Sequence, residues 1–393
     1  MRPGSLRYQR RTRLFALTVA AGCAAAFPVL TTQAPAGAAP PEVACGWSPR
    51  IGAGTFNVAY PDTFANYWMT FVPAAPGTSV TLHGDFPHAR YMSFVSYSAL
   101  GVATDVLTDT SIAPDAGSVN PFPAGADRET GNRSYTVRVV AGDRPENPEP
   151  NTLYARATNG VIPVIYRVYR PDAGLDAMGG TGLPRTTVHA PGGGAYELAD
   201  CGASTSDFDP HGVFPEGRTR LGGRATPPPH APQWAGREGG GLFPNPDNKY
   251  LATLVDSGRT AVVRGRVPET PDTFSGAARM QPAQLRYWSM CSGDGPSTST
   301  LGCLVDDELP VDENGEFTIV VSAPENRPDP GCGVAWLPAN SGETLLIMRN
   351  MLPAEDFPNS VQGADPENPQ PVMGPYYPEV TYPADTGEPD GLC

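Results

Sequence analysis

The run "ARYMSFVSYS" (residues 89–98) returns 196 residues later as "LRYWSMCSGD" (residues 285–294). Both runs have an arginine and a tyrosine at their second and third positions and continue with a mixture of aromatic, aliphatic and serine side chains. This composition is typical of a β-strand, because aromatic and β-branched residues fit a pleated sheet. One strand written twice raises the question of whether the chain holds two copies of a larger unit.

Four further stretches recur in the same order, with almost constant spacing. The pairs are "YPDTFANYWMTFV" (60–72) with "NPDNKYLATLV" (245–255), "TSVTLHGDFP" (78–87) with "RTAVVRGRVP" (259–268), "YTVRVVAGDRP" (135–145) with "FTIVVSAPENRP" (317–328), and "VIYRVYRP" (164–171) with "LIMRNMLP" (346–353). Gly84 and Gly265 are 181 residues apart, and Arg167 and Arg349 are 182 apart. The wider spacing of the opening strand is explained by an insertion, "ETPDTFSGAARMQPAQ", in the second copy. Matching order and spacing predict an internal duplication.

Each copy is expected to fold as a β-sandwich. Its apolar runs are short and rich in Val, Tyr, Phe and Thr, and they show no long stripe of helical period. The chain also contains 44 glycines and 46 prolines, which suits short strands joined by many turns. One turn is explicit, because Asn314-Gly315 precedes "EFTIVV" and supplies residues that accept a positive φ. Residues 60–72 fit either a strand or a short helix.

We therefore predict an all-β protein of two jelly-roll-like β-sandwich domains that arose by internal duplication and are joined by a Gly/Pro-rich linker. The predicted ranges are 39–203 for the first domain, 204–243 for the linker and 244–393 for the second domain. The linker combines the stiff run "TPPPHAP" with the flexible run "GREGGG".

Residues 1–38 are predicted to be a secretory signal peptide. "RYQRRTRLF" supplies the basic segment, "LFALTVAAGCAAAFPVL" the apolar segment, and "AGA" a small-residue cleavage site. A membrane anchor is the less favoured alternative, because Pro28 interrupts the apolar run. Twin-arginine export and lipidation at Cys23 are left open. The expected location is secreted or extracellular, with envelope association left open and no integral membrane segment after cleavage.

The net charge argues against one class of partner. The formal charge is −14, and loss of the signal peptide, which holds five arginines and no acid, would make it −19. A surface this acidic repels phosphate backbones, so no nucleic-acid partner is expected.

Six cysteines remain after cleavage, and an even number in an exported chain predicts disulfides. No CxxC pair or His-Cys cluster argues for a metal site instead. Six cysteines allow many pairings. Among the pairings that keep each bond within one copy, we predict Cys45–Cys201, Cys291–Cys303 and Cys332–Cys393.

The second copy contains the string "DENGEFTIVVSAPENRPDPGCGVAWLPANSGETLLIMRNMLP" (312–353). It resembles the C-terminal β-sandwich of a bacterial family built from the domains of unknown function 1254 and 1214. The first copy matches more weakly, and the second departs from the pattern at Ala335, where the family has asparagine. The resemblance implies a jelly-roll-like sandwich and brings no activity with it. The matching residues are Tyr287, Trp288, Ser289, Gly315, Trp336, Leu337, Pro338, Ala339, Gly342, Leu345, Arg349 and Pro353.

Few residues indicate catalysis or metal binding. His83, Asp85 and His88 form the densest cluster of metal-type ligands, but they flank a turn and are expected to be solvated. No G-x-S-x-G nucleophile elbow is present, so the serines of the repeated strand are expected to be structural.

Charged residues of the repeat suggest two further features. The acids of "DDELPVDENGE" (306–316) are expected to form a solvated loop, with Ca²⁺ binding left open although Pro310 interrupts the spacing. Arg167 and Arg349 occupy equivalent positions, and each is expected to pair with an acid, because an arginine near a core must be matched.

Aromatic residues give the best candidate binding site. Tyr67, Trp68 and Tyr91 offer rings that suit sugar or lipid-like ligands, and packing in the sandwich core is the alternative use. We therefore expect an exported, non-catalytic protein that binds a carbohydrate, lipid or other envelope ligand. The alternatives are an exported hydrolase or lyase acting on polysaccharide or lipid, and a structural envelope protein. No cofactor is expected, with Ca²⁺ left open.

Overall fold

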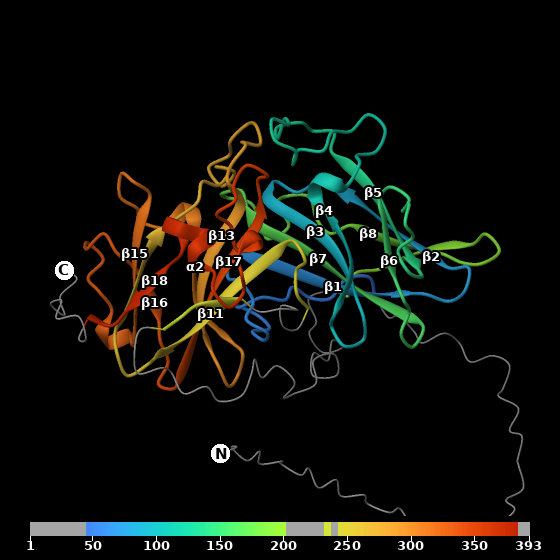
Figure 1. Cartoon of the computed structure of the whole chain (residues 1–393). Coiled ribbons are helices and arrows are strands. Elements are labelled where there is room, and N and C mark those ends of the chain that lie inside the picture. The colour runs from blue at the N-terminus through green and yellow to red at the C-terminus, as the bar shows by residue number, and fades with distance from the viewer. Residues whose placement is uncertain (1–44, 202–231, 237–242, 384–393) are drawn as a thin grey trace, which may run out of the picture. The chain divides into compact units, whose positions relative to one another are not determined.

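The computed structural model describes residues 45–201, 232–236 and 243–383 (Figure 1). We call residues 45–201 the first half and the described residues from 232 to 383 the second half. The predicted signal peptide with Cys23, most of the predicted linker, and Cys393 lie outside the described residues.

The first half is built from two sheets, with strand orders β1-β7-β3-β4 and β6-β5-β2-β8-β9. Neighbouring strands are antiparallel except β5 and β6, which are parallel. The strands are β1 (Ala65–Pro73), β2 (Ser79–Asp85), β3 (Ala89–Tyr97), β4 (Ala103–Thr108), β5 (Ser134–Ala141), β6 (Thr152–Ala155), β7 (Val161–Pro171), β8 (Arg185–His189) and β9 (Ala195–Leu198). The short 3-10 helix η1 (Asp109–Ser111) follows β4.

The second half also has two sheets, with orders β10-β11-β17-β13-β14 and β16-β15-β12-β18. Its strands are β10 (Ala235–Gly236), β11 (Asn248–Asp256), β12 (Ala261–Arg266), β13 (Leu285–Asp294), β14 (Thr300–Val305), β15 (Glu316–Ser322), β16 (Ala335–Pro338), β17 (Glu343–Pro353) and β18 (Glu379–Thr381). Its helical segments are η2 (Asp306–Glu308), η3 (Pro324–Asn326), η4 (Val361–Gly363), the α-helix α2 (Gln370–Met373) and η5 (Gly374–Tyr376).

The two halves repeat one strand order. Across the sheets, β1-β7-β3-β4 of the first half corresponds to β11-β17-β13-β14 of the second half, and β6-β5-β2-β8 corresponds to β16-β15-β12-β18. The all-β sandwich architecture is confirmed. The internal duplication stays a prediction, and the shared strand order is what it would produce. Residues 60–72 hold strand β1 rather than a helix.

Each half has its own apolar core between its two sheets. In the first half Trp68, Phe94 and Tyr166 pack together, and the rings of Phe94 and Tyr166 are stacked at 5.0 Å. In the second half Trp288 and Phe317 occupy the corresponding space. Strand alternation explains this arrangement, because every second residue of a strand points to the same face of its sheet.

Part of the predicted linker belongs to the second sandwich. Trp234 is 1% exposed and packs in the second core. The two residues after it form β10, which pairs with β11. An isolated tryptophan among prolines and glycines gave no periodic signal, and for this reason the sequence did not reveal the added strand.

Strand β3, the repeated strand of the first half, is buried at all nine positions. One face lies in the first core, where Met92 and Phe94 point inward. On the other face, Tyr91 joins a cluster that also contains Tyr169 of β7 and Tyr287 of β13. Because this cluster draws residues from both halves, the strand is enclosed on two sides, and a strand of this kind carries no simple hydrophobic-polar alternation.

Two of the predicted disulfides are present. Cys45 bonds Cys201 across the first half, and Cys291 bonds Cys303 within the second. The third predicted pair, Cys332–Cys393, includes a residue outside the described ranges and stays a prediction.

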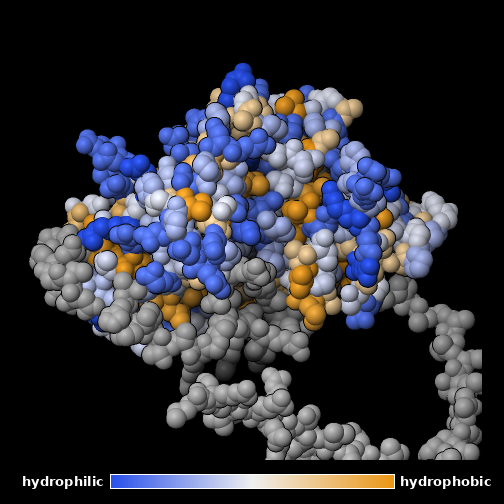
Figure 2. Space-filling model, viewed as in Figure 1, coloured by the Kyte–Doolittle hydropathy of each residue, from blue (hydrophilic) through white to orange (hydrophobic). Residues whose placement is uncertain are grey.

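The surface seen in Figure 2 is mostly hydrophilic, with hydrophobic side chains in several separate patches. Among the described residues, no helix combines the length and the apolar character that a membrane crossing requires.

Candidate functional site

Arginines at equivalent positions of the two halves reach across to the opposite half. Arg90 of β3 makes ion pairs with Asp306 and Asp307, and the Arg90 and Asp306 side chains are almost completely buried. Arg286 of β13 makes the reciprocal pair with Asp109, at 3.0 Å. The two ion pairs follow one pattern. The 3-10 turn after β4 contacts Arg286 of β13, and the 3-10 turn after β14 contacts Arg90 of β3.

Each of these aspartates also holds its own half together. Asp109 accepts a hydrogen bond from the Met92 backbone N–H at 3.2 Å, and Asp306 accepts one from the Trp288 N–H at 2.9 Å. Burial raises the pKa of Asp109 to about 6, against the opposing effects of Arg286 and the Met92 N–H. Burial raises the pKa of Asp306 as well, with Arg90 opposing it.

The expectation of a solvated acidic loop is therefore wrong for Asp306, in the first part of the loop (306–308). Asp306 is buried, and Asp307 and Glu308 both bind Arg170 of the first half. The second part is exposed, and Asp312 accepts the backbone N–H groups of Asn314 and Glu316 at 2.8 Å. The partners of the first part lie far away in sequence, so composition alone did not indicate them.

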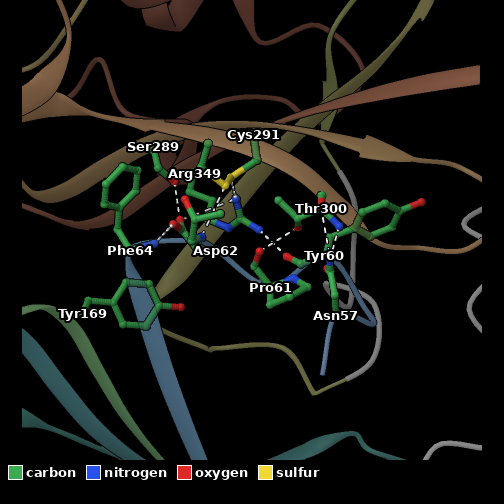
Figure 3. The surroundings of a disulfide bond; sticks show 12 residues. Asn57, Tyr60, Pro61, Asp62, Phe64, Tyr169, Ser289, Cys291, Thr300 and Arg349 are labelled. Carbon is green, nitrogen blue, oxygen red and sulfur yellow. Dashed lines mark hydrogen bonds and ion pairs between the residues drawn. A yellow bond between two sulfur atoms is a disulfide. The ribbon is translucent and has the colours of Figure 1, made fainter. Parts of the chain in front are cut away.

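A second arginine site surrounds the Cys291–Cys303 disulfide (Figure 3). Arg349 of β17 donates one hydrogen bond to Cys291 Sγ at 2.8 Å and another to the Tyr60 carbonyl at 2.7 Å. Its guanidinium lies 3.6 Å from the Asp62 carboxylate. Burial disfavours the charge of Arg349, but Asp62 and nearby tyrosines hold its pKa above the ordinary value.

Asp62 accepts hydrogen bonds from residues of both halves. Its carboxylate accepts the Ser289 hydroxyl at 2.6 Å and the Phe64 backbone N–H at 3.0 Å. Ser289 belongs to the repeated strand β13, and this buried contact fits the structural role expected for it. The expected pairing of Arg349 with an acid is confirmed by Asp62.

The equivalent place in the first half has no sulfur. Val95 of β3 stands opposite Val106 of β4, in the register that Cys291 and Cys303 occupy between β13 and β14. Arg167 binds the Tyr97 hydroxyl at 2.5 Å and the Phe243 carbonyl at 2.9 Å, and no acid of the described residues pairs with it. The expectation of an acid partner is thus wrong for Arg167. Burial disfavours the charge of Arg167, but the surrounding tyrosines outweigh burial and raise its pKa, so these acceptors take the place of a carboxylate.

Within the described residues, one group of three metal-type side chains comes close together, namely Asp62, Cys291 and Cys303. The two sulfurs are bonded to each other, so neither offers the thiolate that a metal ion requires. His83 and His88 are not part of this group. His83 lies 3.5 Å from Asp115, and His88 contacts Arg133, whose charge together with burial lowers the pKa of His88 to about 4.

The predicted ligand-binding aromatics differ in burial and in the face of the sheet that they occupy. Trp68 is 4% exposed and packs in the first core, and Tyr91 is fully buried with its hydroxyl on Asp247 at 2.7 Å. Tyr67 is half-buried, and its hydroxyl lies 3.3 Å from that of Tyr169. Tyr67 and Tyr91 share one mixed cluster, whereas Trp68 faces the opposite side of the sheet. A ligand-binding role for these residues stays a prediction, and their burial fits the alternative of core packing.

A pocket of about 490 Å³ opens on the second half, beside sheet β16-β15-β12-β18. Arg264 of β12 stands between Thr318 of β15 and Glu379 of β18 in the strand register. Ala261 and Val263 of the same strand point into the core, so the alternation directs Arg264 to the outer face. The lining residues are Arg264, Gly265, Pro310, Val311, Asp312, Glu316, Phe317, Thr318, Gly333, Gln370, Gly374, Pro375, Tyr377 and Glu379.

No protein-family model and no curated protein matches the sequence. A solved structure of an uncharacterized protein from Burkholderia cenocepacia superimposes with a TM-score of 0.50 at 12% identity, over 88% of this chain and 84% of that chain. A protein from Vibrio parahaemolyticus matches with a TM-score of 0.39 at 13% identity, over 82% of this chain and 89% of that one. The first likeness shows the fold alone, and it extends over both halves. The resemblance to the domain of unknown function 1214 stays a prediction.

Proposed function

We propose that the protein is an exported, non-catalytic binding protein whose pocket beside β12, β15 and β18 takes a carbohydrate-type ligand. The observation that carries this proposal is the lining of the pocket. Arg264, Glu316 and Glu379 provide charged donors and acceptors, and Thr318 and Gln370 add a hydroxyl and an amide. Sugar hydroxyls are bound by such a dense set of hydrogen-bonding groups.

The lining also separates the candidate ligand classes. A lipid tail needs a pocket with predominantly apolar walls, because burying an unpaired polar group beside it costs free energy. Four charged side chains line this pocket, so a polar ligand suits it better than an acyl chain.

One acid at the pocket, Asp312, is unsuited to be the general acid of a hydrolase. Asp312 is exposed, and hydrogen bonds from the Glu316 and Asn314 backbone lower its pKa. A general acid for glycoside hydrolysis needs the opposite, a raised pKa. Export is supported by the two disulfides, which form and persist in oxidising compartments.

The test is a glycan and lipid binding screen of the full chain, with and without Ca²⁺. Glu379→Gln keeps the shape of the side chain and removes its charge, so we expect it to weaken glycan binding by roughly tenfold, the value of one charge-assisted hydrogen bond. Glu149→Gln, on an exposed side chain outside the pocket, is the control and should bind as the wild type does. Failure of every glycan to bind, or equal binding by both variants, would refute the proposal.

A further inference from the structure

The Cys291–Cys303 bond is the feature that most clearly distinguishes the second half from the first. We propose that it is a reactive disulfide that exchanges with an external dithiol. Cys303 is the sulfur attacked, and Arg349 stabilises the Cys291 thiolate that departs. The inference is independent of the proposed pocket and concerns a different part of the second half.

Access differs between the two sulfurs. Cys291 is 1% exposed within β13, whereas Cys303 in β14 is partly exposed. An incoming thiolate must approach one sulfur along the S–S axis, so the outer sulfur is the one that it reaches. The backbone N–H of the exposed Thr63 lies 3.4 Å from Cys303 Sγ and provides a donor on that side.

The inner sulfur has the features of a good leaving group. Arg349 donates to Cys291 Sγ at 2.8 Å within a buried environment. A neighbouring cation favours a thiolate over a thiol, and a thiol that ionises easily leaves faster in exchange. Asp62 works against this effect, because its carboxylate also lies next to Arg349. The Ser289 hydroxyl and the Phe64 N–H bind that carboxylate and hold it in place.

Exchange between the dithiol and the protein disulfide needs no further oxidant or reductant. A thiolate of the dithiol attacks Cys303 Sγ, the S–S bond breaks, and its electron pair passes to Cys291 Sγ beside Arg349. The second thiolate of the dithiol then attacks the dithiol's first sulfur, which is bonded to Cys303 Sγ in the mixed disulfide, and releases Cys303 as a thiolate. The dithiol has lost two electrons and become a disulfide, and the protein disulfide has gained them. The two protons of the dithiol pass to solvent or to the new cysteine thiolates.

We expect the fold around the bond to survive its reduction. The first half keeps the same two strands together with Val95 opposite Val106 and no covalent link. The Cys291–Cys303 bond closes a sequence separation of 12, against 156 for Cys45–Cys201. A short loop restrains the unfolded chain less, so its disulfide contributes less to stability. After reduction the β13–β14 ladder still holds the two cysteines opposite each other, ready to be oxidised again.

The test compares the two disulfides of the described residues within the same molecule. The full chain is treated with limiting dithiothreitol, quenched with an alkylating reagent and mapped by mass spectrometry. We expect Cys291–Cys303 to open at least roughly tenfold faster than Cys45–Cys201, although both cysteines of the latter are also partly exposed. With glutathione, the mixed disulfide should form on Cys303. Equal or slower opening, or an adduct on Cys291, would overturn the proposal.

Two variants separate reactivity from structure. Asp62→Asn keeps the shape of the side chain and removes the charge that opposes the Cys291 thiolate, so reduction should accelerate several-fold. The double variant Cys291→Val with Cys303→Val copies the first half and should remain folded, with near-UV circular dichroism unchanged. An unchanged rate in a folded Asp62→Asn protein, or unfolding of the double valine variant, contradicts a reactive role.

Discussion

At the residue scale, Asp109 and Asp306 of the two 3-10 turns place carboxyl groups in the protein interior. Asp109 binds its own strand through Met92 and the opposite half through Arg286. One of its oxygens is buried without a hydrogen-bond partner among the described residues. This incomplete solvation explains why burial outweighs the nearby arginine and raises the pKa of Asp109.

The raised pKa of Asp109 predicts a pH-dependent stability. The folded value of about 6 exceeds the ordinary value of 3.8, so the folded state binds the proton more tightly than the unfolded state. The resulting stabilisation is complete below about pH 4 and is lost as the pH rises through about 6, by about 3 kcal/mol in all. We expect the free energy of unfolding of the wild type, relative to Asp109→Asn, to fall by about this amount between pH 4 and pH 7 in urea titrations.

A control of opposite sign is available in Asp143. Arg156 lowers the pKa of this exposed carboxyl, so its contribution to stability is lost as the pH falls. The difference between wild type and Asp143→Asn should therefore increase slightly, if at all, as the pH rises. A difference between wild type and Asp109→Asn that stays constant across the range would contradict the assignment.

The sequence predicted the chemistry of single residues only where the partner was local or covalent. It indicated two of the disulfides and an acid partner for Arg349. It did not indicate that Asp306 would be buried on Arg90, or that Arg349 would lie on Cys291 Sγ. Those contacts depend on how the two halves meet, and neither local propensity nor spacing within one copy contains that information.

At the element scale, strand β13 packs against a segment from the other half. The Tyr60 ring lies over Gly293, so a Cβ added there would come within 2.6 Å of a ring carbon. Gly293 does not adopt a positive φ. The glycine is therefore needed for space and not for backbone conformation.

Gly293→Ala should consequently destabilise the protein by steric conflict. The Tyr60 ring is buried and its hydroxyl binds the Gly295 carbonyl, which limits its freedom to move aside. We expect a loss of about 1–3 kcal/mol in the free energy of unfolding, as for other overpacked sites. Gly131→Ala, where a Cβ meets nothing within 4 Å, is the matched control and should change stability by less than about 0.5 kcal/mol. Equal stability of the two variants would show that Tyr60 is not fixed on β13.

The elements themselves were the most predictable part of the molecule. Short runs rich in Val, Tyr and Phe gave the strands, and the turn before β15 has Gly315 at a positive φ of 76°. Strand β10 was missed because two residues beside Trp234 carry no period. The sequence did not reveal that β3 is buried on both faces, since a strand with Arg90 and two serines suggests at least one solvent-exposed face.

At the scale of the whole molecule, two similar sandwiches are joined by reciprocal contacts. The ion pairs Arg90–Asp306 and Arg286–Asp109 exchange the same groups in opposite directions. A mixed cluster that includes Tyr91, Tyr169 and Tyr287 lies with them. Such an arrangement resembles the self-complementary contact of a symmetric dimer, formed here within one chain.

These contacts predict that the halves unfold together. Arg90 is completely buried between Asp306 and Asp307, and its loss would leave a buried carboxylate unpaired. Arg90→Ala should lower the free energy of unfolding by about 3–5 kcal/mol, whereas Arg138→Ala, which breaks an exposed pair with Glu149, should cost about 1 kcal/mol or less. Calorimetry of the wild type should show one transition, because neither half can lose its partner without exposing these charges. Two well-separated transitions in the wild type, or equal effects of the two arginine variants, would mean that the halves are stable independently and that the reciprocal pairs do not couple them.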